Sequence, residues 1–452
     1  MRPEPASRAR PPLRSTRLSV GTVFLVVFVL ASSGPFGVEE MVSASGPGLA
    51  LLLLLLVPVV WGMPLALVCT ELASAIPDEG GAYAWVERGL GRFWAFQVGW
   101  WSSLSGLVDT SLYVVLAVTY ANGWLEQPPL VAWLMSVSLI AVFATLNVRS
   151  VRGMALSSAV FAVIIMVPCI ILTMLGLAGW SQNPFAPLVP PNQSLGVSLG
   201  FGLTVALWFY SGYESMSTMA GEVEHPARVI PRALLLSIPV VIAIYFLPTL
   251  AGLASVGRWS EWSSDGGTTL VDIARTLGGP VLAIAMTAAA LASSLALYNA
   301  YLASGARTTF VMAERGLLPP VFARVHPRFG TPVGSILVTA VLHALLATWS
   351  FEALLVIDVL LFVLGYVVVF VASVALRRTE PELARPFRIP LGTTGLATLV
   401  SAPIAVAAAF LWVNGVVALV WGIAAATTGP MAWALSRTRS ARRAPRSRDT
   451  AE

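Results

Sequence analysis

The hydrophobic positions of this chain form long blocks that short charged or Pro- and Gly-rich stretches separate. The block from Leu49 to Val60, for example, contains no charged residue. A helix that spans a membrane needs about 20 mostly apolar residues, and the pattern predicts twelve such helices. They lie at Leu18 to Ser45, Gly48 to Ala75, Phe93 to Asn122, Leu130 to Leu146, Ala155 to Ala178, Ser198 to Ala220, Ala233 to Val256, Pro280 to Ala303, Val333 to Trp349, Ala353 to Leu376, Leu396 to Trp412 and Val416 to Leu435.

Two of the predicted helices contain an interruption, at Ala31 to Gly37 in the first and at Trp208 to Glu214 in the sixth. A Pro flanked by two Gly removes backbone hydrogen bonds that lipid cannot replace, so such backbone is expected to line a cavity. Two breaks five helices apart predict an inverted repeat with the substrate between the broken ends. Ordinary kinks are the alternative, because Gly and Pro are common in membrane helices.

We therefore expect an all-α polytopic membrane protein with twelve transmembrane helices, arranged as a five-plus-five inverted repeat in which helices 1 and 6 are broken. The expected parts are a cytoplasmic tail at 1–17, a first repeat at 18–178, a second repeat at 198–376, helices 11 and 12 at 396–435 and a second cytoplasmic tail at 436–452. A cleaved signal peptide is an alternative for the first block, because arginines precede it and small residues follow it. The break motif argues against that alternative.

Arginine placement orients the predicted helices, because cytoplasmic loops hold positive charge. All 27 basic residues are arginine, and 25 of them fall in the tails or in alternate loops on one side. Only Arg258 and Arg275 fall on the other side. Both termini are therefore expected in the cytoplasm, with the chain in the plasma (inner) membrane.

Composition narrows the function further. With 57% apolar and 11% charged residues in 452, the chain is not a water-soluble enzyme. The net charge of +5 reflects the topology and predicts no nucleic-acid partner. Cys69 and Cys169 both lie in apolar blocks, and no metal-ligand spacing occurs, so neither a metal nor another cofactor is expected.

Four longer motifs resemble a known group of proteins. They are SSGPFGVEEMVSASGPGLALL in the first predicted helix, IPDEGGAYAWV after the second, SGYESMSTMAGEVEHPARVIPRAL in the sixth and AERGLLPPVFARVHPRFGTP after the eighth. They resemble the amino acid-polyamine-organocation superfamily of secondary transporters. RPFRIPLGTTG from Arg385, together with GLVDTSLYVVL around Asp109, is similar to the branch of plant and protozoan polyamine uptake permeases.

The resemblance implies the leucine-transporter-type fold and alternating access, with substrate bound on the exposed backbone of the two broken helices. Carried onto this chain, it implies substrate contacts at Ser32, Ser33, Gly34 and Gly37 in the first break and at Trp208, Ser211 and Gly212 in the second. Pro35 removes one N–H donor from the first break, which favours a substrate without a carboxylate.

Acids at membrane depth point to a cationic substrate, because a buried carboxylate is costly and no arginine lies in a helix core to neutralise one. The acids are Glu39, Glu40, Asp109, Glu214 and Asp358. Glu214 closes the second break, and of Glu39 and Glu40 one can face the site while the other lies at the outer mouth. Asp109 and Tyr113 share a helix face. For Asp358, a neutral acid bonded to a neighbouring helix is an equal alternative.

Aromatic residues near the breaks can stack over a cation or a methylene chain. They are Phe36, Trp208, Phe209, Tyr210 and Tyr213. Coupling is predicted to use a proton, or to be exchange, with Glu214 as the carrier. Sodium-dependent relatives of this fold use hydroxyls in the eighth helix, where Ser293 and Ser294 are the candidates, but small-residue helix contacts explain these serines equally well.

The sequence thus predicts a permease for a small cationic or zwitterionic substrate, either polyamines or cationic amino acids. A permease of the same fold for neutral amino acids is the first alternative, and it predicts that Glu39, Glu40 and Asp109 are dispensable. A membrane-embedded enzyme is the second, although no protease or metal motif supports it. A passive channel fits poorly, because paired broken helices suit a site that is occluded.

Overall fold

The computed structural model describes residues 21, 24, 34–78, 80–149, 158–212, 226–264, 266–314, 318–415, 420 and 423–434. Within these residues the fold is helical, and the only β pairing is an isolated bridge between Trp262 and Thr268. In chain order the elements are α2 (Val38–Ser45), α3 (Pro47–Val57), the π-helical turn η1 (Pro58–Gly62), α4 (Met63–Ala75), α5 (Ala82–Leu90), α6 (Arg92–Leu125), α7 (Pro129–Val148), α8 (Ser158–Ala178), α9 (Leu195–Phe209), α10 (Pro226–Ser255), η4 (Trp259–Glu261), α11 (Leu270–Glu314), η5 (Pro320–Ala323), α12 (Val333–Leu346), α13 (Phe351–Thr379) and α14 (Thr393–Val413).

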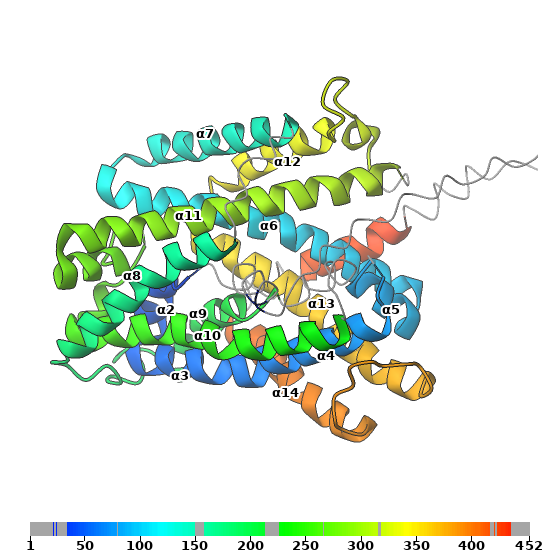
Figure 1. The fold of residues 1–452 in the computed structure, drawn as a ribbon, viewed down its shortest axis with the longest axis horizontal. Helices are drawn as coiled ribbons and strands as arrows, with labels where there is room; N and C mark the ends of the chain where they lie inside the picture. The colour runs from blue at the N-terminus through cyan, green and yellow to red at the C-terminus, as the bar shows by residue number, and fades with distance from the viewer. Residues whose placement is uncertain are drawn as a thin grey trace, which may run out of the picture.

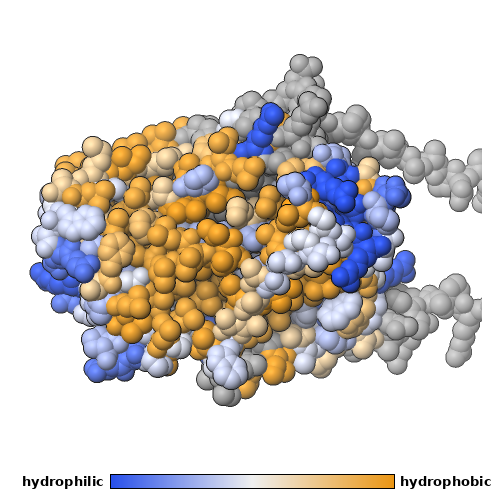
Figure 2. Space-filling model, turned by 90° about the horizontal axis from the view of Figure 1, so that it is seen from below, coloured by the Kyte–Doolittle hydropathy of each residue, from blue (hydrophilic) through white to orange (hydrophobic). Residues whose placement is uncertain are grey.

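The outer surface matches a lipid environment. Eight helical segments of the described chain are long and apolar enough to cross a membrane. Figure 2 shows an apolar band across the middle of the molecule, with hydrophilic residues gathered at its two ends. Side chains such as Leu52, Leu56 and Val59 are exposed although their helix is almost wholly apolar, as expected where lipid replaces water.

The long helices run side by side along the molecule's longest axis (Figure 1). α6 packs against α13 on one side and α11 on the other, while α8 and α10 pack together and against neighbouring helices. α2 packs against α9, where Gly202 lets the two helices approach so closely that a Cβ atom there would overlap the Ser45 hydroxyl. α9 also packs against α13, and Trp208 near its end bonds to Asp109 in the middle of α6. The start of α2 lies next to Tyr120 of α6 and Phe351 of α13.

Non-helical backbone adjoins both short helices. α2 begins at Val38, and residues Gly34 to Gly37 before it are not helical. Gly34 and Gly37 have φ angles of 86° and 93°, which other residues adopt only with strain. α9 ends at Phe209, and Ser211 and Gly212 after it are not helical. These positions coincide with the two interruptions predicted from the sequence.

Several helices extend beyond the apolar blocks that predicted them. α11 runs to Glu314, well past the predicted end at Ala303, and it begins at Leu270 with a kink at Gly279. The kink separates an amphipathic first part from the apolar span, which starts at Pro280 as predicted. The helix continues through the charged residues at the end of the apolar block. It can do so because its backbone hydrogen bonds lie within the helix and are kept outside the lipid as well.

A buried ion pair joins α13 to α4, and the segment after α13 is hydrogen-bonded to the same pair. Arg377 donates to both carboxylate oxygens of Glu71, at 2.8 and 2.5 Å, and the side chains are 1% and 5% exposed. Ile389 N–H also donates to Glu71, and Arg377 donates to the carbonyls of Ile389 and Leu391. The Arg-rich motif beginning at Arg385 thus wraps around one acid, which fixes one end of the bundle.

Candidate functional site

A central cavity of about 190 Å³ lies where α6, α9, α11 and α13 meet. Five residues of α13 from Asp358 to Val369 and six of α6 from Val98 to Tyr113 line it, so it follows these two helices for several turns. One end reaches Ala82 at the start of α5. The other end stops at Tyr113 and Trp208, below the segment from Gly34 to Gly37.

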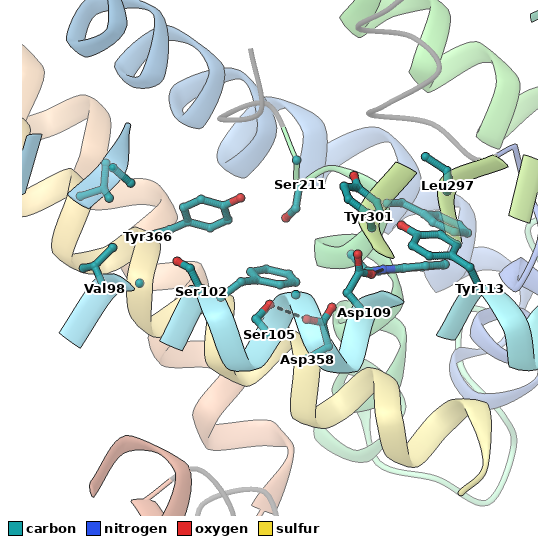
Figure 3. Close-up of a pocket in the computed structure, with 18 of the residues that line it drawn as sticks. Val98, Ser102, Ser105, Asp109, Tyr113, Ser211, Leu297, Tyr301, Asp358 and Tyr366 are labelled. Atoms are coloured by element: carbon teal, nitrogen blue, oxygen red, sulfur yellow. Dashed lines mark hydrogen bonds between the residues drawn. The ribbon is translucent and has the colours of Figure 1, made fainter. Parts of the chain in front are cut away.

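Two carboxylates enter this cavity from different helices (Figure 3). Asp109 of α6 accepts a hydrogen bond from Trp208 Nε1 at 2.9 Å, and Asp358 of α13 accepts one from Ser105 Oγ at 2.5 Å. Ser105 and Asp109 are four residues apart and share a face of α6, which explains why the two acids lie near one another. Among the described residues that line the cavity, none is basic.

Aromatic rings form the wall next to Asp109. The Tyr113 ring lies 6.0 Å from the ring of Trp208 and 5.8 Å from that of Tyr301, centroid to centroid. Trp208 also packs against Phe351, with the rings nearly perpendicular at 73°. A ring face beside a carboxylate favours a cation, and its apolar surface suits a methylene chain.

The non-helical residues after α9 also line the cavity. Ser211 Oγ donates to the carbonyl of Leu207 at 2.6 Å, and Trp61 Nε1 donates to Ser211 Oγ at 3.3 Å. Gly212 has a φ angle of 91°. A serine tied to the last turn of a helix and a glycine beyond it leave backbone near the cavity without a bulky side chain.

The structure brings six of the sequence-predicted site residues into the cavity: Asp109, Tyr113, Trp208, Phe209, Ser211 and Gly212. Four others, Ser32, Ser33, Tyr213 and Glu214, lie outside the described residues. Gly34, Phe36 and Gly37 lie in the non-helical segment before α2 and do not line the cavity. Phe36 is instead fully buried against Tyr120, with ring centroids 5.3 Å apart.

Other predicted residues lie away from the cavity. Tyr210 points from it, because its hydroxyl donates to the carbonyl of Leu54 at 2.8 Å. Glu39 and Glu40 extend from α2 to the loop between α10 and α11, where Ser264 and Leu270 donate to them. Both acids lie in the first turn of α2, two and three residues after Gly37, and their side chains reach that loop rather than the cavity.

The two serines of α11 are buried among neighbouring helices. Ser293 Oγ donates to the Ala290 carbonyl within the same helix, and Ser294 Oγ has no hydrogen-bond partner. Both precede Leu297, which does line the cavity, by about one turn. Neither Ser293 nor Ser294 lines the cavity.

Sequence reasoning did not select several residues of the cavity. For Asp358 the sequence indicates a substrate-binding acid and a structural acid equally, and it gives no prediction for Ser105, Tyr301 and Tyr366. A usable signal existed for Asp358, which is the one acid in the apolar block from Ala353 to Leu376. For Ser105, the signal is its spacing of four from Asp109. Tyr301 and Tyr366 carry no local signal, because any membrane helix contains such aromatics.

Comparison with known proteins identifies the family. The amino acid permease profile matches residues 23–437. The chain belongs to the amino acid permease family. Among its relatives, the polyamine transporter PUT1 of Oryza sativa subsp. japonica is 33% identical over 423 residues, which cover 90% of this chain and 76% of that protein. A probable polyamine transporter of Arabidopsis thaliana is 33% identical over 400 residues, covering 86% and 78%.

The fold has a relative among solved structures. The crystal structure of MhsT in complex with L-phenylalanine is similar with a TM-score of 0.58, at 16% identity, over 93% of this chain and 98% of that chain. At this identity the likeness concerns the fold alone, which is the leucine-transporter type. It agrees with the fold that the motif resemblance implies.

These findings confirm the resemblance drawn from the motifs. The permease is a multi-pass membrane protein and a secondary transporter of amines or amino acids, and it is not an enzyme.

Proposed function

We propose that the permease carries polyamines or cationic amino acids across the plasma membrane, bound in the central cavity between Asp109 and Asp358. The observation that carries this proposal is that two acids from different helices share one cavity that no described basic residue lines. Each intramembrane acid costs about 3 kcal/mol on insertion scales, and such acids mark functional sites by default. A ligand with two or more amino groups matches two carboxylates in one cavity. The names of the rice and Arabidopsis relatives support the same substrate class.

We propose that the chain has twelve transmembrane helices, which are two inverted repeats of five helices followed by helices 11 and 12. We assign the first break to the segment before α2 and the second to the segment after α9, whose non-helical backbone supports both assignments. The arginine distribution supports cytoplasmic termini. In that orientation α5 lies on the cytoplasmic side. Because the cavity extends towards Ala82 at the start of α5, the structure corresponds to an inward-facing conformation.

The mechanism we propose is alternating access. Amino groups of the substrate pair with Asp109 and Asp358, while the rings of Tyr113, Trp208 and Tyr301 hold its methylene chain. The backbone near Gly212, which lines the cavity, supplies further polar contacts. Contacts from Ser32 and Ser33, which lie outside the described residues, are also part of the proposal. Proton coupling or exchange, with Glu214 as carrier, remains part of the proposal, and Ser293 and Ser294 are the residues for the sodium alternative.

A panel of substrates tests the proposal. The purified permease in proteoliposomes should take up putrescine, spermidine or arginine, and it should do so under a proton gradient or by exchange without sodium. Leucine should be carried far less well, because it offers one amino group to two carboxylates. Uptake of leucine alone would show that the cavity serves neutral amino acids and would overturn the cationic assignment.

A further inference from the structure

Two adjacent carboxylates of α2, outside the central cavity, hold the loop that connects α10 to α11. Glu39 is fully buried, and all its partners are neutral donors. Its Oε1 atom accepts from Tyr120 OH at 2.8 Å and from Leu270 N–H at 3.0 Å, and its Oε2 atom accepts from Gly37 N–H at 3.0 Å. Both oxygens of this carboxylate are therefore occupied.

Glu40 is bound differently, although it holds the same loop. Its Oε1 atom alone accepts three hydrogen bonds, from Ser263 Oγ at 3.0 Å, Ser264 N–H at 2.6 Å and Ser264 Oγ at 2.7 Å. In the described part of the chain no ion pair joins Glu39 or Glu40 to a basic side chain. Each acid therefore depends on the loop for donors that water would otherwise supply.

These contacts lie between two cavities. A second cavity, of about 1210 Å³, lies beyond them and is lined by Thr119, Tyr120, Ser264 and Thr269. One stripe of α6 connects the two spaces, because Asp109, Tyr113, Leu116 and Tyr120 follow helical spacing. Asp109 and Tyr113 line the central cavity, Leu116 is fully buried, and Tyr120 lines the second cavity.

We propose that Glu39 and Glu40 are the outer gate of the transport path and that the second cavity is its outer vestibule. The proposal rests on the inward-facing assignment made above. Ser263, Ser264 and Leu270 are held across the path while they donate to the two carboxylates. When they withdraw, Glu39 and Glu40 exchange these three residues' donors for water, and Leu116 becomes accessible from the vestibule.

The acceptor atoms of the two acids give a sharp test. In Glu40→Gln the amide oxygen can accept all three hydrogen bonds, so the gate should stay closed. In Glu39→Gln the amide oxygen can accept from Tyr120 and Leu270, and the amide nitrogen then faces only Gly37 N–H, which also donates to Tyr120 OH at 3.1 Å, so the gate should stay closed here too. Glu39→Ala and Glu40→Ala remove the acceptor and should open the gate. Ser43→Ala is the control, because Ser43 Oγ bonds only to carbonyls of its own helix.

Gate opening can be measured with a cysteine at Leu116 in a background where the buried Cys69 and Cys169 are replaced by alanine. A membrane-impermeant maleimide added outside intact cells should label Leu116→Cys about ten times faster in Glu39→Ala and Glu40→Ala. The rate should be unchanged in Glu39→Gln, Glu40→Gln and Ser43→Ala. A second reporter, Ser102→Cys in the central cavity, should be labelled more slowly from the cytoplasmic side of inside-out vesicles when the outer gate opens.

Two results would overturn the gate. The first is unchanged labelling of Leu116→Cys in both Glu39→Ala and Glu40→Ala. The second is faster labelling of both reporters, which indicates loss of the fold rather than gating. Because labelling needs no substrate, failure of the gate is distinguishable from failure of polyamine uptake in the proteoliposome panel.

Discussion

Replacing Asp109 with asparagine should lower spermidine uptake by at least about 30-fold while leaving the permease folded. The amide oxygen can still accept the hydrogen bond that Trp208 donates, so the wall of the cavity keeps its arrangement. The negative charge is lost, however, and removing one partner of a buried charge pair costs about 2–5 kcal/mol. Initial rates of radiolabelled spermidine uptake into proteoliposomes measure the effect.

A neighbouring substitution provides the control for Asp109→Asn. Thr110 is buried on the same helix, bonds only to the Gly106 carbonyl of that helix and does not line the cavity. Thr110→Val should therefore transport at close to the normal rate. Spermidine uptake that is equal in Asp109→Asn and Thr110→Val would remove Asp109 from the substrate site.

Replacing Arg377 with alanine should lower the free energy of unfolding by about 3–5 kcal/mol, because it leaves the buried Glu71 carboxylate without its main partner. Arg385 Nε lies 3.4 Å from Glu71 and compensates only in part. The loop carbonyls of Ile389 and Leu391 lose their donors at the same time. Thermal unfolding of the purified protein in detergent measures the loss as a lower midpoint temperature.

An exposed ion pair at the same end of the molecule is the matched comparison. Arg88 binds Glu380 at 2.6 Å, and these side chains are 43% and 33% exposed. The hydrogen bonds from Arg88 hold the pKa of the Glu380 carboxyl below its usual value, but water screens the pair. Arg88→Ala should cost at most about 1 kcal/mol. Equal unfolding temperatures for Arg377→Ala and Arg88→Ala would show that burial of the Glu71 pair does not matter.

Helix positions could be predicted well where charge ends an apolar block. α6 begins at Arg92 and ends at Leu125 before Glu126, within a few residues of the predicted span from Phe93 to Asn122. The shared face of Asp109 and Tyr113 followed from helical spacing, and both line the cavity. Such predictions succeed because they depend on contacts within one helix.

Contacts between distant segments could not be predicted in this way. The donors to Glu39 and Glu40 are mostly backbone N–H and serine groups of a loop more than 200 residues away. The aromatic residues at the end of α9 point in different directions, so Trp208 faces the cavity while Tyr210 bonds to α3. Asp358 needed its neighbour Ser105 on another helix before its place in the cavity was evident. Each case depends on tertiary packing, which local patterns do not encode.

The central claim is that Asp109 and Asp358 together hold the amino groups of the substrate. A structure of the permease with spermidine bound tests it most directly. We expect the chain of spermidine to lie along the rings of Tyr113 and Tyr301, with one nitrogen within about 3 Å of each carboxylate. Spermidine bound elsewhere, or bound in this cavity with both carboxylates still turned to protein donors alone, would contradict the account.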